Sequence, residues 1–485
     1  MAEHDLILLT ILIPALGSIL IAIAGERYRN VREGISLLSA VLLFIVVYLL
    51  YQGLPDSQLE AVKLETVMPG LTIAFRLEPL GILFAIIASF LWIITTIFSI
   101  GYMRGNGESH QTRFYVCFAW AIASTMGVAL SANMFSLFIF YEFLTLTTYP
   151  LVTHSGTDEA MRSGRLYLGY LLGTSICLQL FAIVWTWSLT GTLDFTHGGV
   201  FAGEFPEIVV TVLFALYIFG IGKAALMPFH RWLPAAMVAP TPVSALLHAV
   251  AVVKAGVFTV LKISVYLFGL DELAASGATD WLVFVSGATI IIASVIALQQ
   301  DNLKARLAYS TISQLSYVIM ATAVLAPLSI IGAAMHIAVH ALGKITLFFC
   351  AGSIYTASKK KNVSQLDGIG HYMPWTMAAF TIGSLSMIGV PPAAGFLSKW
   401  YMLLGAYQAQ VWTAVTVIVI STLLNAAYFL PIVYAAYFRE PPRSITPHGE
   451  APAPVVIALC ITAVLTLAVF FYPGPLLELV KQIGK

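Results

Sequence analysis

The sequence predicts an all-α polytopic membrane protein with about fourteen transmembrane helices. Of its 485 residues, 59% are hydrophobic and 10% are charged, whereas soluble domains carry about 25% charged residues. Apolar runs of about 20 residues, enough to cross the hydrocarbon core of a bilayer, recur along the whole chain. Lys and Arg gather in alternate connections between these runs, as is typical of cytoplasmic loops. We therefore expect a single membrane domain, 1–485, with both termini outside.

The apolar runs place the individual helices. The predicted spans are 5–25, 34–53, 79–101, 113–131, 133–152, 165–189, 207–227, 241–269, 279–298, 306–326, 328–356, 375–409, 411–437 and 452–472. The odd-numbered connections carry the basic residues that set the orientation, namely Arg27, Arg29, Arg32, Arg104, Arg162, Arg165, Arg231, Lys304, Arg306, Lys359, Lys360, Lys361, Arg439 and Arg443. Lys63 and Arg76, in the second connection, do not follow this alternation. The connection over 299–317 fits either a cytoplasmic loop leading into a helix with a polar face or a surface that contacts a neighbouring subunit.

Helix breaks suggest an internal repeat. The predicted breaks lie at Pro228, Pro234, Pro240 and Pro242 in the seventh and eighth helices, and at Pro391 and Pro392 in the twelfth. Broken helices in corresponding halves are typical of inverted-repeat transporters. Helices one to three (1–112) would precede two five-helix units, 113–270 and 279–437, and a last helix with a tail, 451–485. Five is an odd number, so the second unit would lie upside down.

Composition excludes several classes of function. The formal net charge of +1 provides no basic surface for a nucleic-acid partner. The four cysteines stand singly, without the paired spacing of a disulfide framework, a zinc site or an iron–sulfur site. Neither a dinucleotide-binding nor a P-loop glycine motif is present. We expect no cofactor and no metal, so an ion gradient or a partner protein would have to supply energy.

The stretch 220–256, GIGKAALMPFHRWLPAAMVAPTPVSALLHAVAVVKAG, carries two lysines inside apolar runs, Lys223 and Lys254. A lysine at bilayer depth is costly unless it has a partner or water, and it is a functional hypothesis by default. Glu142 lies about nine residues into the fifth helix, roughly 14 Å deep. We expect Glu142 to pair with Lys223; the alternative is a purely structural ion pair. Lys262, nearer the outer end of the eighth helix, is expected to extend toward the interface.

Histidines and further lysines extend this series. His336, His340 and Lys344 stand at i, i+4 and i+8 in the eleventh helix and so share one face, while Lys399 follows the break in the twelfth. Histidine titrates near neutrality, so this face indicates a row of side chains that pass protons from one to the next. A zinc site is one alternative, although no cysteine or carboxylate completes it, and three core residues satisfied by hydrogen bonds are the other. His248 is a secondary candidate, with a core histidine as its alternative.

The stretch KAALMPFHRWLPAAMVAPTPVSALLHAVAVVKAG resembles the signature of the antiporter-like membrane subunits shared by Mrp-type cation/proton antiporters, respiratory complex I and membrane-bound hydrogenases. The resemblance implies fourteen helices, inverted five-helix repeats and a proton-translocating row. Within that row it implies an essential glutamate at Glu142, a gating lysine at Lys223, a bridging lysine at Lys254 and a terminal charged residue at Lys399. His336, His340 and Lys344 would form the central relay.

Lys399 and the short tail resemble the D-type Mrp subunit most. The sequence around HRWLPAAMVAPTP is also similar to that of the largest Mrp subunit and of hydrogenase-type relatives. Two functions follow. The first is a proton-translocating subunit of a multisubunit Na⁺/H⁺ antiporter in a bacterial inner membrane, with other membrane subunits, lipid, protons and Na⁺ as partners. The second is the proton-pumping subunit of a redox-driven complex. A scaffold that has lost transport is a further alternative.

Overall fold

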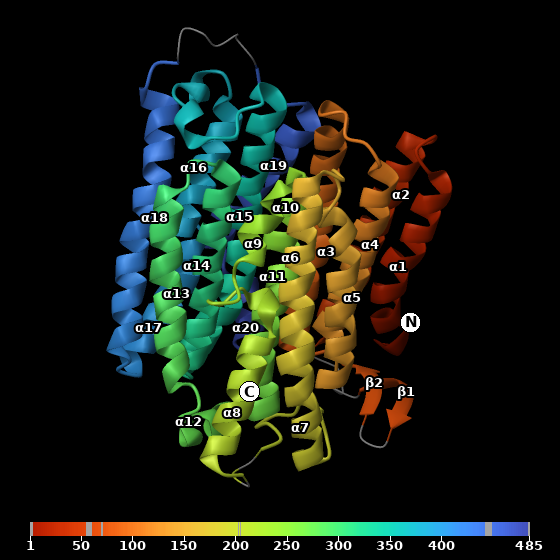
Figure 1. Ribbon diagram of the computed structural model, residues 1–485, viewed down its shortest axis with the longest axis vertical. Helices are drawn as coiled ribbons and strands as arrows, with labels where there is room; N and C mark the ends of the chain where they lie inside the picture. Colours follow the sequence, from red (N-terminus) through yellow and green to blue (C-terminus); the bar gives the residue numbers. More distant parts are fainter. Residues whose placement is uncertain are drawn as a thin grey trace.

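The computed structural model describes residues 3–54, 61–68, 71–201, 203, 205–441 and 449–483, so that Arg443 lies outside the described residues. Most of these residues are helical, and the long helices run side by side in one bundle (Figure 1). The helices up to the centre of the chain are α1 (Glu3–Ala24), α2 (Arg29–Gly53), α3 (Pro79–Gly105), α4 (Gln111–Leu130), α5 (Met134–Val152), α6 (Asp158–Thr174), α7 (Phe181–Thr190), α8 (Glu207–Gly220), α9 (Trp232–Ala235), α10 (Thr241–Ala245) and α11 (Val252–Lys262). The helices that follow are α12 (Leu270–Ser276), α13 (Asp280–Gln299), α14 (Leu303–Ala323), α15 (Pro327–Ser358), α16 (Pro374–Ile388), α17 (Gly395–Gln408), α18 (Trp412–Phe438), α19 (Ala453–Phe471) and α20 (Gly474–Val480).

Each predicted apolar run coincides with a helix or with a broken helix. Within the described ranges, eleven helices are long and apolar enough to cross a membrane. The three other predicted runs correspond to α8, which has 14 residues, to α14, whose face is rich in polar residues, and to α16 and α17, which a break separates. The prediction of an all-α polytopic membrane fold is therefore confirmed.

A short hairpin in the second connection was not predicted. Strands β1 (Val62–Met68) and β2 (Leu71–Phe75) pair antiparallel, with Val62 opposite Phe75. Phe75 also bridges to Ser131, between α4 and α5. The hairpin is therefore attached to the bundle where α3 begins.

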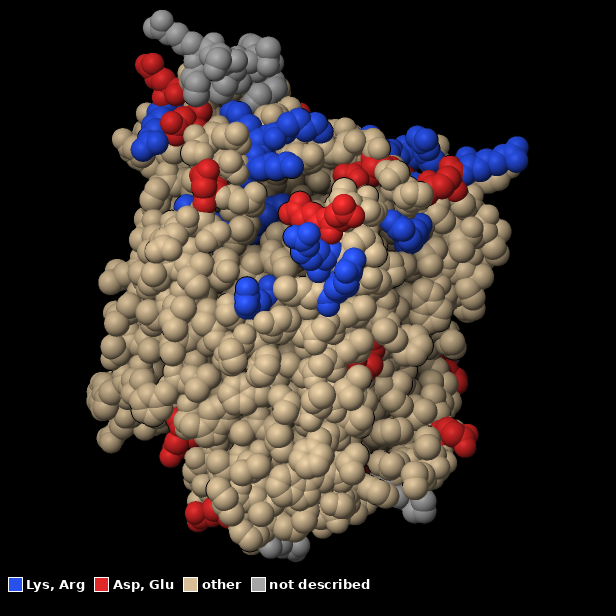
Figure 2. Space-filling model, in the orientation of Figure 1, with Lys and Arg blue, Asp and Glu red and all other residues tan. Residues whose placement is uncertain are grey.

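Charge separates the two ends of the bundle. On the face that Figure 2 shows, Lys and Arg lie in the upper part together with several acidic side chains, and the few charged side chains visible in the lower part are acidic. Figure 1 places the start of α1, the hairpin and α20 on the lower side. This is the arrangement expected if the upper face is cytoplasmic and both ends of the chain are outside.

Two long helical segments form the centre of the bundle. The segment Thr241–Phe268, which comprises α10, α11 and two π-helical turns, is buried along its whole apolar length, and α15 is buried almost as completely. By contrast, only a third of the apolar window of α1 is buried inside the chain. The outer helices thus face lipid, and the central pair carries Lys254, Lys262, His336, His340 and Lys344.

The two predicted five-helix units contain the same succession of elements. The third member is long in both, at 33 residues for Asp158–Thr190 and 32 for α15. The fourth member is broken in both, after α8 in one and between α16 and α17 in the other. The predicted prolines are not equivalent, however. Pro391 and Pro392 lie in the break, whereas Pro234 and Pro242 lie in the first turns of α9 and α10, where proline is tolerated.

An ion-pair network ties α1 and α2 to α3 and α4 on the upper face. The buried guanidinium of Arg32 donates to Glu26 at 2.6 Å and to Gln111 at 2.8 Å, and Arg104 pairs with Glu33. Burial of Glu26 acts to raise its pKa, but hydrogen bonds from Thr112 and Arg32 outweigh it, so the pKa lies below the usual 4.5. The ionised carboxylate is therefore the form that stabilises this end of the bundle.

Glu26→Gln keeps the hydrogen-bonding shape and removes the charge. We expect a lower unfolding midpoint at neutral pH, by the equivalent of about 0.2–1 kcal/mol because Glu26 is half exposed and screened by water. A carboxyl with a lowered pKa stabilises the fold above its ordinary pKa and loses that contribution as the pH falls through the folded value. The gap between the variant and the wild type should thus close below about pH 4.5. A gap that persists at acid pH in thermal melts would contradict this assignment.

Candidate functional site: a buried lysine and histidine row

Lys223 lies in the break that follows α8. The helix ends at Gly220, and a single 3-10 turn, Gly222–Ala224, holds Lys223 fully buried. Its Nζ donates to the carbonyl oxygen of Tyr141 at 2.7 Å and to the hydroxyl of Thr145 at 2.6 Å. The same atom lies 3.2 Å from the centroid of the Tyr141 ring. Helix α5 thus supplies these contacts to the ammonium group.

The predicted ion pair between Glu142 and Lys223 is not formed in this structure. Both carboxyl oxygens of Glu142 are shielded, and neither has a hydrogen-bond partner within the described part of the chain. The reason is helix geometry, because Tyr141 and Thr145 are one turn apart and share a face, while Glu142 is rotated by about 100° from Tyr141. The Glu142 carboxyl remains close enough to Lys223 for an electrostatic interaction.

Helix α11 touches this break at Gly256. A Cβ atom built on Gly256 would lie 2.3 Å from the backbone nitrogen of Ala224 and 2.4 Å from the carbonyl carbon of Lys223. Carbon atoms in contact normally stay about 3.5–4.0 Å apart. Glycine at this position therefore allows the helix of Lys254 to approach the break of Lys223.

Gly256→Ala is expected to push α11 away from the break. Overpacking of this kind costs about 1–3 kcal/mol, so we expect less assembled protein in the membrane and a lower thermal midpoint. Gly173→Ala, in α6, is the matched control because a Cβ there meets no atom within 4 Å. Native gels measure the assembled protein and thermal melts measure the midpoint of both variants. Equal values for the two variants would show that the close contact does not contribute to stability.

Lys254 contacts the eleventh-helix histidines directly. Its Nζ lies 2.5 Å from Nδ1 of His340, and both side chains are fully buried. The helix around Lys254 is irregular, since a π-helical turn, Leu246–Val250, ends in a bend at Ala251. The predicted break of the eighth helix is thus at Ala251, beyond the prolines.

His248 lies in this π-helical turn without any polar contact. Neither of its ring nitrogens has a hydrogen-bond partner among the described residues, and its ring is 4.7 Å from that of Phe348. Buried polar groups are normally satisfied. Two unsatisfied nitrogens next to the relay therefore favour a functional role over a core histidine.

The two histidines of α15 continue the row toward the second break. The rings of His336 and His340 are stacked, with centroids 5.6 Å apart. His336 lies 2.8 Å from the Ser398 hydroxyl through Nδ1 and 3.1 Å from the Gln314 side-chain oxygen through Nε2. The amide nitrogen of Gln314 donates to the carbonyl of Met387 at 3.2 Å.

Lys399 closes the row at the break between α16 and α17. Its Nζ donates to the carbonyl of Met387 at 2.8 Å and to that of Ile388 at 3.0 Å, the last residues of α16. The ammonium also lies 4.7 Å from the centroid of the Tyr317 ring. Because Gln314 and Lys399 share the Met387 carbonyl, polar contacts link His336 to Lys399, and the stacked rings of His336 and His340 extend the row to Lys254.

Lys344 leaves this path on a side branch. Its Nζ donates to the Ser310 hydroxyl at 2.8 Å, and the hydroxyl of Tyr428 donates to the same oxygen at 3.0 Å. The backbone carbonyl of Tyr428 accepts a bond of 3.1 Å from Arg306, a residue near the upper face. The branch therefore points from the relay toward that face.

Sequence reasoning missed the polar side chains that connect the charged ones. They are Tyr141, Thr145, Ser310, Gln314, Tyr317, Ser398 and Tyr428. A signal for some of them exists, since Ser310, Gln314 and Tyr317 follow at i, i+4 and i+7 in α14 and line one face. That face is buried inside the chain. The connection over 299–317 is thus a loop leading into a helix with an inward polar face.

The prediction for Lys262 was wrong. The side chain is fully buried and forms an ion pair with Glu78 at the start of α3. The reason is that the unpredicted hairpin and the loop before α5 cover this end of α11.

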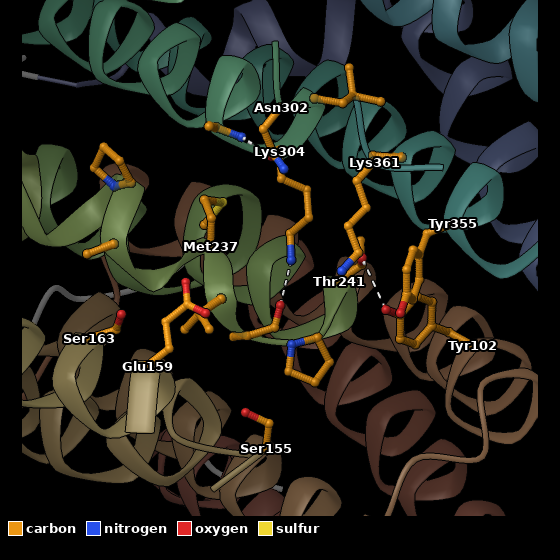
Figure 3. Close-up of a pocket in the computed structure, with 18 of the residues that line it drawn as sticks. Tyr102, Ser155, Glu159, Ser163, Met237, Thr241, Asn302, Lys304, Tyr355 and Lys361 are labelled. Atoms are coloured by element: carbon orange, nitrogen blue, oxygen red, sulfur yellow. Dashed lines mark hydrogen bonds between the residues drawn. The ribbon is translucent and has the colours of Figure 1, made fainter. Parts of the chain in front are cut away.

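A cavity of about 470 Å³ opens on the upper face above the start of α10. In Figure 3, Lys304 and Lys361 extend into it from one side, and Glu159 and Ser155 lie on the opposite side. Lys304 donates to the carbonyl of Ala239 at 2.5 Å and so links the second five-helix unit to the break of the first. The cavity lining reaches Thr241, seven residues before His248.

Two groups in the connections around this cavity have shifted pKa values. Burial raises the pKa of Glu108 above its ordinary value, with Lys359 and Lys304 acting in the opposite direction. Burial lowers the pKa of Lys360, with Asp367 opposing the shift. Both shifts bring the pKa of the group closer to neutral pH, and a group with such a pKa exchanges its proton more readily there.

No cluster of three or more His, Cys, Asp or Glu side chains suited to a metal ion occurs in the ranges that the structure covers. The zinc alternative for His336 and His340 meets a further obstacle. Nδ1 of His340 faces Lys254, and both nitrogens of His336 face polar side chains. Three of the four ring nitrogens therefore already contact side chains of the row, while the two rings stack on each other.

Comparison with known proteins decides the family. The family model described as "NADH:quinone oxidoreductase/Mrp antiporter, TM" matches residues 131–425, more than half of the chain. The chain belongs to this family. The N-type subunit of the NADH-quinone oxidoreductase of Desulforudis audaxviator is 33% identical over 393 residues, which cover 80% of this chain and 76% of the relative. The D-type subunit of the Na⁺/H⁺ antiporter of Alkalihalophilus pseudofirmus is 25% identical over 487 residues, which cover 99% and 97%.

Solved structures agree on the fold of this family member. A chain in the Mrp complex of Dietzia sp. superposes with a TM-score of 0.88 at 21% identity, covering 100% of this chain and 97% of the other. A chain of the membrane-bound sulfane sulfur reductase, an archaeal respiratory complex, gives the same TM-score at 22% identity and the same coverage. This chain is therefore an antiporter-like membrane subunit of the kind found in Mrp and complex I-like assemblies.

Proposed function

We propose that this antiporter-like subunit translocates protons within a Mrp-type Na⁺/H⁺ antiporter of a bacterial cell membrane. The row of Lys254, His340, His336 and Lys399 carries this proposal, because lysine and histidine side chains exchange protons and the row joins the two units, with Gln314 linking His336 to the carbonyl that Lys399 contacts. The assignment to the Mrp branch draws support from the D-type relative, which this chain matches along nearly its full length.

In this mechanism Lys223 exchanges protons in the first unit and Lys399 in the second. A lysine buried among carbonyl and hydroxyl groups gains or loses its proton according to the charge next to it. Glu142 acts on Lys223 by approaching or leaving it, since its carboxyl has no competing hydrogen bond among the described residues. Lys254, His340 and His336 then pass the change in charge to Lys399.

The cavity beside Lys304 and the histidine at position 248 provide the upper-face entry in this scheme. His248 lies beyond the cavity floor on the same continuous helix and reaches toward the relay helix α15. Na⁺ would be carried by the assembled complex with its other membrane subunits, because a row of lysines and histidines suits protons better than a hard cation.

A redox-driven complex is the second candidate. It is favoured by the 33% identity to the N-type subunit of a NADH-quinone oxidoreductase. The same row would then respond to electron transfer in partner subunits instead of to a sodium gradient.

Purification of the native complex separates the two. The antiporter proposal expects small membrane subunits without redox centres and Na⁺-dependent proton exchange in everted vesicles. Flavin, iron–sulfur or nickel–iron subunits in the purified complex, together with proton uptake that follows electron transfer and ignores Na⁺, would replace it with the second candidate.

A further inference from the structure

A second buried acid–base pair lies outside the row, at the lower end of α11. Lys262 has no exposed side-chain area and Glu78 has 4%, and the two form an ion pair. The Lys262 ammonium also donates to the carbonyl of Ser131 at 2.7 Å. It lies 4.7 Å from the centroid of the Phe195 ring.

This pair is connected to the lower face through Arg76. The Arg76 guanidinium lies 3.2 Å from the second carboxyl oxygen of Glu78 and donates to the carbonyl of Phe195 at 2.6 Å. Its side chain is 19% exposed. The hairpin that ends just before Arg76 lies on the lower side of the bundle, away from the Lys- and Arg-rich face (Figure 1). Arg76 therefore separates a buried carboxyl from water on the outer side.

The pair is also connected to the row. Lys262 follows Lys254 by eight residues on α11, so the two lysines share one helix face about 12 Å apart. Phe258 stands midway on that face, 5.4 Å from the Lys262 ammonium to its ring centroid. An aromatic side chain on the same helix thus lies between the two lysines and contacts the Lys262 ammonium.

The charges in this cluster do not balance. Arg76 and Lys262 are two cations on one carboxylate, and even a balanced buried ion pair contributes little net stability. A fold that needed only an anchor here would be served as well by apolar packing. Burial of the excess positive charge costs free energy, and release of a proton from the cluster lowers that cost.

We propose that Glu78 and Lys262 form a proton-exchange site that connects the central row with the outer face. The proposal rests on the function proposed above. The Lys262 ammonium passes a proton to the Glu78 carboxylate, which leaves a neutral amine and a neutral carboxylic acid. When Arg76 turns toward water, the acid releases that proton to the outside. The amine takes up the next proton from Lys254 through water that enters when Phe258 moves aside, and uptake from outside follows the same steps in reverse.

Lys262→Arg, in the assembled complex, tests this proposal. Arginine keeps the positive charge and its pairing with Glu78, but it does not lose its proton in proteins. We expect normal assembly on native gels and a fall in the proton exchange rate of everted vesicles by about a hundredfold, the weight of a positioned proton-transfer group. Exchange close to the wild-type rate would overturn the proposal, because it would leave the pair with a structural role alone.

A double variant covers the case in which arginine does not fit. Glu78→Gln with Lys262→Met removes both charges and roughly preserves volume. Normal assembly with lost exchange supports the proposal, whereas normal exchange overturns it. Loss of assembly in both variants also overturns it, since the pair would then be structural. Lys223→Ala in the same vesicles distinguishes failure of this site from failure of the proposed function. If Lys223→Ala is inactive and Lys262→Arg is active, the proposed exchange site is wrong and the proposed function stands.

Discussion

Lys223→Ala is expected to abolish Na⁺-dependent proton exchange in everted vesicles while the complex still assembles. The ammonium is buried and held by Tyr141 and Thr145, and alanine cannot carry a proton at this position. Loss of a positioned proton-transfer group lowers rates by about 10²–10⁴-fold. Glu142→Ala should have a comparable effect, because the lysine would no longer respond to a nearby carboxyl.

Glu207→Gln, at the exposed start of α8, is the control for removing a carboxylate. It should exchange protons at the wild-type rate. If Lys223→Ala and Glu142→Ala both transport normally, the proposed mechanism is wrong and the chain acts as a scaffold for its partners.

Lys254→Met and His340→Gln are expected to cut the row at its best-defined contact. Each variant should lower exchange by about a hundredfold. The double variant should be no slower than either single one, because groups that act as one unit have non-additive effects. Initial rates in vesicles, corrected for the amount of assembled complex, provide the test.

Lys63→Met, on the exposed strand β1, is the matched lysine control and should leave the rate unchanged. Losses that multiply in the Lys254→Met/His340→Gln variant would show that the two residues act independently of each other. In that case the 2.5 Å contact between the two side chains would not be the link between the units.

The sequence was sufficient for those parts of the fold that depend on hydrophobic length and charge. Apolar runs located the helices, and glycine and proline indicated the breaks near Lys223 and Lys399. The two lysines were recognisable as candidates because a lysine is costly inside a bilayer. The shared face of His336 and His340 followed from helical periodicity alone, and the stacked rings confirm that they share it.

Other features depend on how segments meet across the bundle. The link of His336 to Ser398 joins residues 62 positions apart, and no local pattern connects them. Lys262 was misplaced because its burial depends on the hairpin and on the loop at Ser131. The absent contact between Glu142 and Lys223 depends on the rotation of α5, which a helical repeat leaves undetermined.

The contacts of Lys399 have a mechanical consequence. Its ammonium caps the last carbonyls of α16, where the helix dipole places partial negative charge. Loss of the proton removes the positive charge that suits this cap, so the remaining amine holds the two carbonyls less strongly than the ammonium does. Each loss of the Lys399 proton would therefore loosen the end of α16, and each return of the proton would tighten it again. A neighbouring subunit packed against this helix end would be moved by the change.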